Sequence, residues 1–492
     1  MFETVELGTT VGKPQFKREA ARLRVALLET QRELAASNVA VVLLLGGVEG
    51  AGKTEMANLF LEWMDARGIQ VHALGEPSDE ERERPRFWRF WRLLPPRGKI
   101  GIFVGSWYTA PLVGRVFRKD AKTELELEFD RIVAFEKMLA QENVLVLKFW
   151  LHLPKAVQKK RLRRLEKDPD TRWRVTKMDW KFFDRYDRFR KVSEQAIART
   201  STAHSPWHLV DAEDGRHRTL TVIRTTLQTI RERLDAARKA KEAPAPKLVL
   251  PRPAPGNILS KLDLSGRLTP KAYEKRLLDA QRRVSLLARR LYDRQRSMIL
   301  VFEGPDAAGK GGTIRRLTQA MDARNYRVIS VAAPTDEERA HPYLWRFWRN
   351  LPRQGRVTIY DRSWYGRVLV ERLEGFCRPE DWQRAYGEIN AFEAELAGFG
   401  TIVAKFWIAI SPEEQLRRFK DRQQTPFKQY KITEEDWRNR EKWDAYLAGA
   451  CDMIERTSTE TAPWTRVAGE DKHWARVQVV ETVARRLESE VG

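Results

Sequence analysis

Cysteine is nearly absent from this chain of 492 residues, which contains only Cys377 and Cys451. Two cysteines are too few for a disulfide framework and match no metal-ligand spacing, so they favour a reducing, intracellular setting. Long apolar runs are also missing: the longest, residues 39–45, is far too short to span a bilayer. No charged segment followed by an apolar core opens the chain, so no signal peptide is indicated. We therefore expect a soluble, cytoplasmic protein.

Acidic residues are few relative to basic ones, with 68 Asp and Glu against 90 Lys and Arg, a net charge of +22. A charge of this size in a chain with a pI near 10.0 is typical of proteins that bind a polyanion. Nucleic acid, an anionic membrane and inorganic polyphosphate all fit this description. The charge alone does not distinguish among them.

The sequence repeats itself at a constant offset of 257 residues, the distance from Gly47 to Gly304. Residues 47–54 read GVEGAGKT, and residues 304–311 read GPDAAGKG. The same offset matches WRFWR at 88–92 with 345–349, and KFW at 148–150 with 405–407. We predict two similar domains, 1–235 and 258–492, joined by a proline-rich, semi-rigid linker at 236–257.

Short apolar runs alternate with charged, helix-like stretches in both halves. The runs at 39–45 and 298–302 have the composition of strands buried on both faces of a parallel sheet. Strands that alternate with helices predict an α/β fold, here a tandem pair of P-loop kinase-like domains with mainly parallel sheets. Between Gln415 and Tyr446 the chain becomes strongly charged and aromatic, which we interpret as a mobile helical lid. Lys428, Lys431 and Arg438 within it are expected to contact phosphates, the alternative being a solvated helical face.

The glycine-rich segment 304–312, GPDAAGKGG, lies after a predicted buried strand and before a predicted helix. Backbone N–H groups of such a loop and the helix dipole bind phosphate, while Lys310 neutralises its charge. Gly311 stands where the usual motif has a Ser or Thr that ligates Mg²⁺, so Asp306 is expected to take more of that role. The phosphate-binding residues predicted here are Gly304, Gly309, Gly311, Gly312 and Thr313.

A second candidate segment, 360–371, begins where another predicted strand ends. Asp361 has the position of a metal-organising aspartate, and Arg362 and Arg367 carry forked donors suited to a terminal phosphate. The aromatic residues that follow recur in both halves, so they are expected to pack in the core. Arg346 and Arg349, interleaved with other aromatic residues, are expected to line an anion path.

The strings GPDAAGKGG and YDRSWYGR (360–367), with residues 431–437, resemble the polyphosphate kinase 2 family. The fused two-copy layout resembles the subgroup that transfers phosphate from polyphosphate to AMP. This resemblance implies Mg²⁺ as cofactor, and it implies catalytic, metal-binding and substrate-binding roles for particular residues. The catalytic set is Asp306, Lys310, Asp361 and Arg362, the metal set is Asp306, Asp361 and Glu371, and Arg367 binds substrate. One departure is Gly366, where the family usually has Asn.

The first half lacks most of these residues. At the same offset Asp306 becomes Glu49, Asp361 becomes Val104, Arg362 becomes Gly105, Arg367 becomes Ala110 and Glu371 becomes Gly114. Lys53 and Thr54 of its glycine loop remain. We predict a non-catalytic first domain that binds polyanion through Lys53, Arg89, Arg92 and Lys148, a purely structural scaffold being the alternative.

The residues together predict Mg²⁺-dependent phosphoryl transfer from inorganic polyphosphate to AMP, giving ADP. We expect no nucleic-acid or membrane partner, and we leave open whether the chain forms a homo-oligomer. One alternative is an ATP-dependent nucleoside monophosphate kinase, whose donor would not need so much positive charge. The other is a nucleic-acid-binding P-loop protein, although the sequence carries no RRM, KH or zinc signature.

Overall fold

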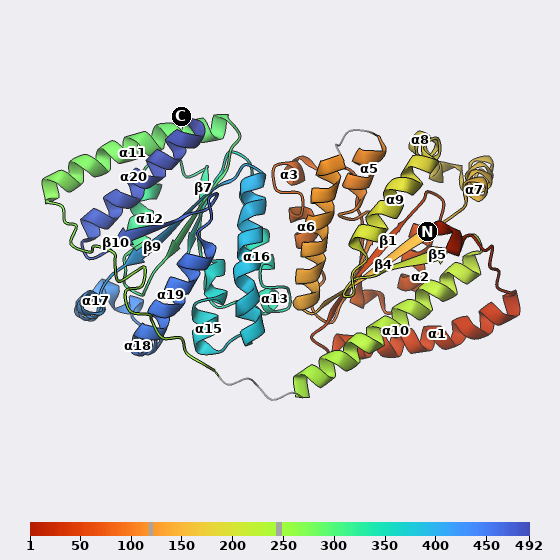
Figure 1. Cartoon of the computed structure of the whole chain (residues 1–492), viewed down its shortest axis with the longest axis horizontal. Coiled ribbons are helices and arrows are strands. Elements are labelled where there is room, and N and C mark those ends of the chain that lie inside the picture. Colours follow the sequence, from red (N-terminus) through yellow and green to blue (C-terminus); the bar gives the residue numbers. More distant parts are fainter. Residues whose placement is uncertain (118–121, 243–247) are drawn as a thin grey trace. The chain divides into compact units, whose positions relative to one another are not determined.

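The computed structural model in Figure 1 describes residues 1–117, 122–242 and 248–492. The chain forms two compact units. Unit 1 comprises Met1–Ser78, Phe87–Pro244 and Pro334–Arg349, and unit 2 comprises Asp79–Arg86, Ala245–Ala333 and Asn350–Gly492. Each unit therefore includes a short segment from the other half of the sequence, an exchange that the repeat pattern did not predict.

The first half of the chain supplies a five-stranded parallel sheet with the order β2-β3-β1-β4-β5. Its strands are β1 (Ala40–Gly47), β2 (Ile69–Ala73), β3 (Ile100–Val104), β4 (Val144–His152) and β5 (Trp207–Asp211). Its helices are η1 (Phe2–Val5), α1 (Lys13–Ala35), α2 (Lys53–Trp63), η2 (Ala66–Gly68), α3 (Asp79–Arg82), α4 (Trp88–Arg92), α5 (Thr109–Val116), α6 (Lys122–Gln141), α7 (Lys155–Lys167), η3 (Arg172–Arg174), α8 (Lys177–Phe183), α9 (Tyr186–Thr200) and α10 (Gly215–Glu242). Helix α10 extends into the predicted linker, whose first residues are thus helical.

The second half repeats this topology with the order β10-β9-β6-β8-β7, again with every strand pair parallel. Its strands are β6 (Met298–Glu303), β7 (Tyr326–Ser330), β8 (Val357–Asp361), β9 (Ile402–Ala409) and β10 (Trp464–Ala468). Its helices are α11 (Pro270–Asp293), α12 (Lys310–Thr318), α13 (Asp336–Arg339), α14 (Trp345–Trp348), η4 (Trp364–Arg367), α15 (Val370–Glu374), α16 (Pro379–Gly398), α17 (Pro412–Gln424), η5 (Pro426–Lys431), α18 (Glu434–Glu441), α19 (Trp443–Thr457) and α20 (Lys472–Val491). The predicted fold class, tandem α/β domains with parallel sheets, is confirmed.

The central strands are hydrophobic because helices cover both faces of each sheet; Figure 1 shows α11 and α20 on one side of the sheet that contains β9 and β10, and α16 and α19 on the other. All six residues of β6 are buried, as are seven of the eight in β1. A strand buried on both faces cannot alternate polar and apolar residues, which is why these segments read as continuous apolar runs. No helix of the described residues is long and apolar enough to cross a membrane.

Each unit contains the same buried ionic network. In unit 2 the Lys405 ammonium donates to Glu393 at 2.7 Å, to the Thr457 carbonyl at 2.7 Å and to the Tyr365 hydroxyl at 2.9 Å. Trp364 and Tyr365 also donate to Glu393, at 3.0 and 2.7 Å. Because both aromatic side chains have 0% exposure, their predicted role in core packing is confirmed.

The matching network in unit 1 corrects one prediction. Lys148 donates to Glu136 and to the Thr200 carbonyl, both at 2.7 Å, and its side chain has 0% exposure. Its prediction as a polyanion contact is wrong, because a fully buried ammonium paired with a carboxylate cannot reach a ligand in solvent.

Replacing Lys405 by Met should leave Glu393 buried without its cation and lower the free energy of unfolding of unit 2 by about 3–5 kcal/mol. The double replacement Lys405→Met with Glu393→Leu should recover part of this loss, because no buried charge is then left unpaired. Urea-induced and thermal unfolding would measure both. The exposed Lys420→Met is a suitable control, expected to change stability by less than about 0.5 kcal/mol. Equal stability of Lys405→Met and the control would contradict the assignment.

Candidate active site

The glycine loop and the Asp-Arg pair leave the sheet of unit 2 at the same edge. Strand β6 runs directly into the loop, and its parallel partner β8 ends at Asp361, which is paired with Phe302. The Arg362 amide donates to the Phe302 carbonyl at 3.0 Å, and a Cβ on Gly311 would lie 3.8 Å from the Asp361 carboxylate. The two segments therefore lie close together.

Lys310 begins α12 with its side chain folded back over the loop. Its ammonium donates to the carbonyls of Gly304 at 2.6 Å and Pro305 at 3.1 Å. Burial lowers the pKa of Lys310, and the nearby Arg362 guanidinium lowers it further. Gly304 adopts φ +145°, and a Cβ there would lie 2.5 Å from the Ile408 carbonyl oxygen, so only glycine fits this turn.

A buried arginine binds the backbone carbonyls of the glycine loop. Arg418 on α17 is 2% exposed and donates to the carbonyls of Ala307 at 2.9 Å and Ala308 at 2.8 Å. Its counterpart in unit 1, Arg161, similarly donates to the Gly50 carbonyl at 3.0 Å. Because both units keep this contact, we assign Arg418 a structural role in fixing the loop.

Two residues of the site have a left-handed backbone that disfavours side chains. Ala307 has φ +64° and Arg362 has φ +63°. The residues at the same positions of unit 1 are glycines, Gly50 at φ +76° and Gly105 at φ +85°. Strained residues of this kind concentrate at functional sites, where the surrounding structure holds them in place. The Arg362 guanidinium is fixed by Asp306, at 2.6 Å.

A cation-rich groove of about 1890 Å³, open to solvent, runs along the glycine loop. The eight cations in its wall outnumber four aspartates, so the groove favours a polyanion. The cations are Lys310, Arg315, Arg316, Arg362, Arg418, Arg422, Lys472 and Arg476, and the aspartates are Asp306, Asp361, Asp421 and Asp436.

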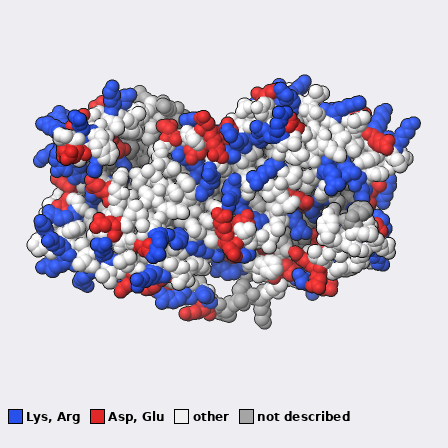
Figure 2. Space-filling view, turned by 180° about the vertical axis from the view of Figure 1, so that it is seen from behind, with Lys and Arg blue, Asp and Glu red and all other residues white. Residues whose placement is uncertain are grey.

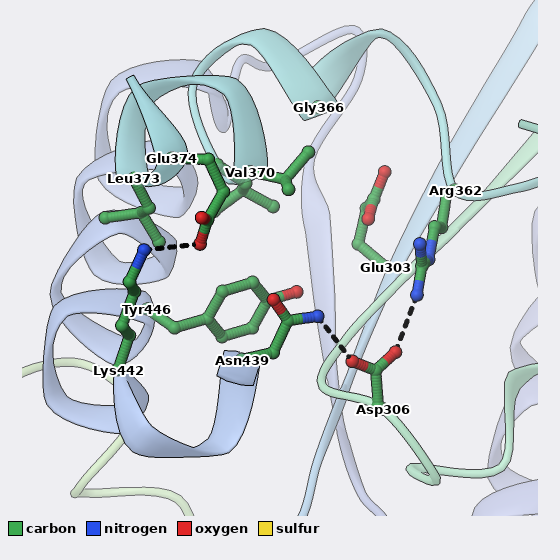
Figure 3. Close-up of a pocket in the computed structure, with 11 residues that line it drawn as sticks. Glu303, Asp306, Arg362, Gly366, Val370, Leu373, Glu374, Asn439, Lys442 and Tyr446 are labelled. Atoms are coloured by element: carbon green, nitrogen blue, oxygen red, sulfur yellow. Dashed lines mark hydrogen bonds and ion pairs between the residues drawn. The ribbon is translucent and has the colours of Figure 1, made fainter. Parts of the chain in front are cut away.

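A smaller cavity, of about 560 Å³, combines apolar side chains with polar groups, which Figure 3 shows on both sides of it: Lys442 with Glu374, and Arg362 with Asp306. Asn439 donates to the Asp306 carboxylate at 2.9 Å (Figure 3), and the Tyr446 hydroxyl donates to the Gly304 carbonyl at 3.4 Å. The other residues that line the cavity are Glu303, Gly366, Leu369, Val370 and Leu373. Asp306 and Arg362 line both cavities, which therefore meet at this ion pair.

Most predicted site residues come together in this region. Those in the wall of the groove are Asp306, Gly309, Lys310, Gly311, Gly312, Thr313, Asp361 and Arg362. Thr313 has its hydroxyl donating to the Gly309 carbonyl at 3.1 Å.

Other predicted residues lie elsewhere. Arg367 and Glu371 form an ion pair at 3.1 Å and are not among the described residues that line either cavity. Arg346 and Arg349 belong to the segment grouped with unit 1, where they pair with Glu338 at 3.3 Å and Glu337 at 3.0 Å. The side chains of Lys428 and Lys431, in η5, fall outside the described residues.

The sequence predictions missed five polar residues of the smaller cavity, two of which, Lys442 and Glu374, form an ion pair at 2.7 Å. Glu303 is 4% exposed and accepts a hydrogen bond from the Ser363 hydroxyl at 2.8 Å. Burial raises the pKa of Glu303 to about 7. The remaining two are Asn439 and Tyr446. At the offset of the repeat Glu303, Asn439 and Tyr446 become Gly46, Phe182 and Phe189, so a full comparison of the two halves would have found these three.

The carboxylates of Asp306 and Asp361 fit a hard divalent cation. Mg²⁺ is commonly held by one or two carboxylates together with substrate phosphates, and both residues line the groove beside the glycine loop. Burial acts to raise the pKa of Asp306, but the cations Lys310 and Arg362 outweigh it and lower the pKa, so this carboxylate stays ionised. No group of three or more His, Cys, Asp or Glu side chains with metal-binding geometry occurs among the described residues, and Glu371 is engaged by Arg367 instead.

In unit 1 the protein's own side chains engage and cover the corresponding loop. Lys53 donates to the Gly47 carbonyl and to Glu49, both at 3.1 Å. Arg218 pairs with Glu55 at 2.7 Å and covers Gly52 so closely that a Cβ there would lie 2.0 Å from its guanidinium. At these positions unit 2 has Gly312 in place of Glu55 and Ala475 in place of Arg218, and both line its open groove.

Comparison with known proteins gives a consistent result. The family model described as polyphosphate kinase 2 matches residues 10–238 and 267–491. The chain belongs to the polyphosphate kinase 2 family. It is 49% identical over 490 residues to a polyphosphate:AMP phosphotransferase of Pseudomonas aeruginosa, an alignment that covers 99% of both chains. It is 45% identical to a protein of the same name from Pseudomonas syringae pv. tomato, over 99% of this chain and 98% of that one. A solved polyphosphate kinase 2 structure from Pseudomonas aeruginosa matches with a TM-score of 0.89 and 47% identity, covering 100% of this chain and 99% of the other.

The pKa of Glu303 makes the stability of this polyphosphate kinase 2 chain depend on pH. Its folded pKa of about 7 lies above the ordinary value of 4.5, so the folded state keeps a proton that the unfolded state releases. Stability should therefore fall by about 3 kcal/mol as the pH rises from about 4.5 to about 7. The variant Glu303→Gln cannot ionise and should lack this decline, as the free energy of unfolding measured across that range would show. Parallel profiles for the two proteins would rule out the assignment, and the exposed Glu413→Gln should follow the unmodified protein.

The strained backbone of Arg362 predicts that two inactive variants at this position will differ in stability. Both Arg362→Gly and Arg362→Ala should abolish phosphoryl transfer, because each removes the guanidinium. The glycine variant should nevertheless be more stable than the alanine variant by about 1 kcal/mol, since glycine adopts φ +63° without strain. Thermal unfolding of the two variants would measure the difference. An alanine variant at least as stable as the glycine variant would show that the backbone is not strained.

Proposed function

We propose that this protein transfers a phosphoryl group from inorganic polyphosphate to AMP, giving ADP. The observation that carries the proposal is the meeting of two unlike cavities at Asp306 and Arg362. One is a cation-rich groove suited to a polyanion, and the other is a small, partly apolar pocket suited to a nucleoside. The names of the full-length relatives, polyphosphate:AMP phosphotransferases, support the same reaction.

The donor chain would lie along the groove of unit 2. The glycine loop offers backbone N–H groups at the start of α12, where the helix dipole also favours negative charge. The cations of α12 and α20, Arg315, Arg316, Lys472 and Arg476, extend the positive wall beyond the loop. The excess of cations over aspartates in this wall favours polyphosphate, a polyanion, as donor.

The acceptor would place its nucleoside in the smaller cavity. Leu369, Val370 and Leu373 supply the apolar wall, while Asn439, Lys442 and Glu374 supply polar groups that could recognise a base or a ribose. The AMP phosphate would then face Arg362, whose forked donors align phosphate oxygens for in-line attack. A phosphate monoester is largely dianionic at neutral pH, its second pKa being about 6, so it attacks without a strong general base.

The divalent cation would be held by Asp306 and Asp361. When bound, Mg²⁺ neutralises charge on the phosphate oxygens as the phosphoryl group passes between donor and acceptor. The protein's part is positional: Lys310 and Arg362 fix the phosphates, and closure by the helical elements around α18 would exclude water. The free thiols of Cys377 and Cys451 support the reducing, cytoplasmic location that we infer.

One assay separates the proposal from its alternatives. The protein is incubated with AMP and Mg²⁺, with either polyphosphate or ATP as donor, and ADP formation is measured. Turnover with polyphosphate and little with ATP is expected, and added salt should weaken it because the donor is held by charge. Preference for ATP would identify a nucleoside monophosphate kinase. No turnover with either donor, combined with tight binding of single-stranded nucleic acid, would favour the nucleic-acid-binding alternative.

The two glycine loops provide a matched pair of variants. Lys310→Ala should lower kcat by about 100-fold or more, since its ammonium stabilises charge at the transferred phosphate. Lys53→Ala should leave most of the activity, because the Lys53 ammonium is already engaged by Glu49. Steady-state kinetics with polyphosphate and AMP would compare them. A loss with Lys53→Ala as large as that with Lys310→Ala would show that the first half takes part in catalysis.

A further inference from the structure

The cations of helix α7 in unit 1 form a charged stripe that the proposed reaction does not use. Lys159, Lys160, Arg163, Arg164 and Lys167, here called the α7 stripe, are all exposed. They occupy positions i, i+1, i+4, i+5 and i+8, so they share one face of the helix. We propose that the α7 stripe is a docking surface for the polyphosphate chain, separate from the catalytic groove of unit 2. This inference rests on the proposed function, because polyphosphate is the substrate that it assigns.

The cations of the stripe are not neutralised by ion pairs in the described part of the chain. Within the described residues no carboxylate forms an ion pair with any of its five members, and the pair nearest to it in the helix joins Lys155 to Asp187 at 2.5 Å. Glu166 on the same helix accepts a hydrogen bond from Trp180 at 3.2 Å. Like charges four residues apart destabilise a helix, so the stripe carries a repulsion that a bound polyanion would remove.

The equivalent helix of unit 2 shows how such cations are otherwise neutralised. On α17, Arg417 pairs with Glu414 at 2.7 Å and with Asp421 at 3.0 Å. At the offset of the repeat these two carboxylates become Val157 and Arg164 in α7. The first half has thus lost the acidic partners and gained a cation on this helix, although it has also lost the catalytic residues.

Position within the fold favours polyphosphate as the occupant. Helix α17 contributes Asp421 and Arg422 to the wall of the polyphosphate groove in unit 2, so its counterpart α7 occupies the same place relative to its own glycine loop. That loop is closed by Arg218 and Glu55, which leaves the outer surface of α7 as the accessible cationic face. Figure 2 shows Lys and Arg side chains, with Asp and Glu among them, spread over one face of the molecule.

Nucleic acid is the rival occupant. Trp173, shortly after α7, is 72% exposed, and the Arg174 guanidinium lies 5.3 Å from its ring centroid. An exposed aromatic ring beside cations can stack on a base, whereas polyphosphate has no base to stack. The test must therefore compare the two polyanions directly.

The test uses the full-length protein with four stripe residues neutralised, K159Q/K160Q/R163Q/R164Q. The matched control neutralises four exposed cations of α1 in the same unit, K13Q/K17Q/R18Q/R22Q, and changes the net charge equally. Equilibrium binding of a long polyphosphate chain and of tripolyphosphate is measured over a range of salt concentrations, without AMP. Phosphoryl transfer from tripolyphosphate to AMP is measured in parallel.

We expect the stripe variant to bind long polyphosphate about tenfold more weakly, with a smaller salt dependence, because fewer counterions are displaced. Its binding of tripolyphosphate, and its kcat and KM with that donor, should match the unmodified protein. The control should bind long chains normally. Unchanged long-chain binding in the stripe variant, or equal weakening in the control, would overturn the proposal.

Two further outcomes are informative. In the first, single-stranded DNA binds more tightly than polyphosphate of similar charge and loses this binding in the stripe variant. That result would assign the surface to nucleic acid and overturn the proposal. If the unmodified protein transfers no phosphate to AMP but still binds long polyphosphate through the stripe, the proposed function fails while the docking surface stands.

Discussion

The parallel pairing of β6 with β8 is the constraint on which the site depends. Because Phe302 pairs with Asp361, the glycine loop and the Asp-Arg pair emerge together at the carboxyl edge of the sheet. The Arg362 amide, bound to the Phe302 carbonyl, then fixes a backbone conformation that an arginine would otherwise avoid. A slip of one residue in this register would turn Asp361 to the opposite face of the sheet. The buried Arg418 completes the arrangement, because its hydrogen bonds to the carbonyls of Ala307 and Ala308 fix the loop.

Because the chain is duplicated, its two units can be compared to separate residues needed for folding from residues needed for the site. Both units keep the buried Lys–Glu network and the arginine behind the loop, so these features belong to folding. Lys310 and Arg418 of the groove have counterparts in unit 1, Lys53 and Arg161. The other cations do not: at the offset of the repeat Arg315, Arg316, Lys472 and Arg476 become Asn58, Leu59, Gly215 and Thr219. The strained positions have also become glycine in unit 1. Strain has thus been relieved where the functional side chain was lost, as expected if it persists only at a working site.

The sequence predicted the sheets, the loop and the Asp-Arg pair because each is encoded within a few neighbouring residues. It missed Asn439 and Tyr446 because they reach the glycine loop, at Asp306 and at the Gly304 carbonyl, from helices more than a hundred residues away, and no local pattern reports that approach. Lys148 was misassigned for a related reason: its partner Glu136 lies on another element, so the strand alone could not reveal a buried ion pair. Glu371 lies one helical turn after Arg367, and their mutual pairing competes with the predicted metal ligation.

The two glycine loops show that a cationic loop requires an anion, which either the substrate or the protein's own side chains can provide. In unit 2 the wide groove stays open, lined by Gly312 and Ala475, so that phosphates of the substrate can fill it. In unit 1 glutamates have taken that role: Glu49 engages Lys53, and Glu55 engages an arginine that covers the loop. The first half has therefore not simply decayed, because random loss would leave the lysine uncompensated. Internal carboxylates neutralise its former site, whereas the five cations of the α7 stripe form no ion pair among the described residues, which is the contrast behind the docking surface that we propose.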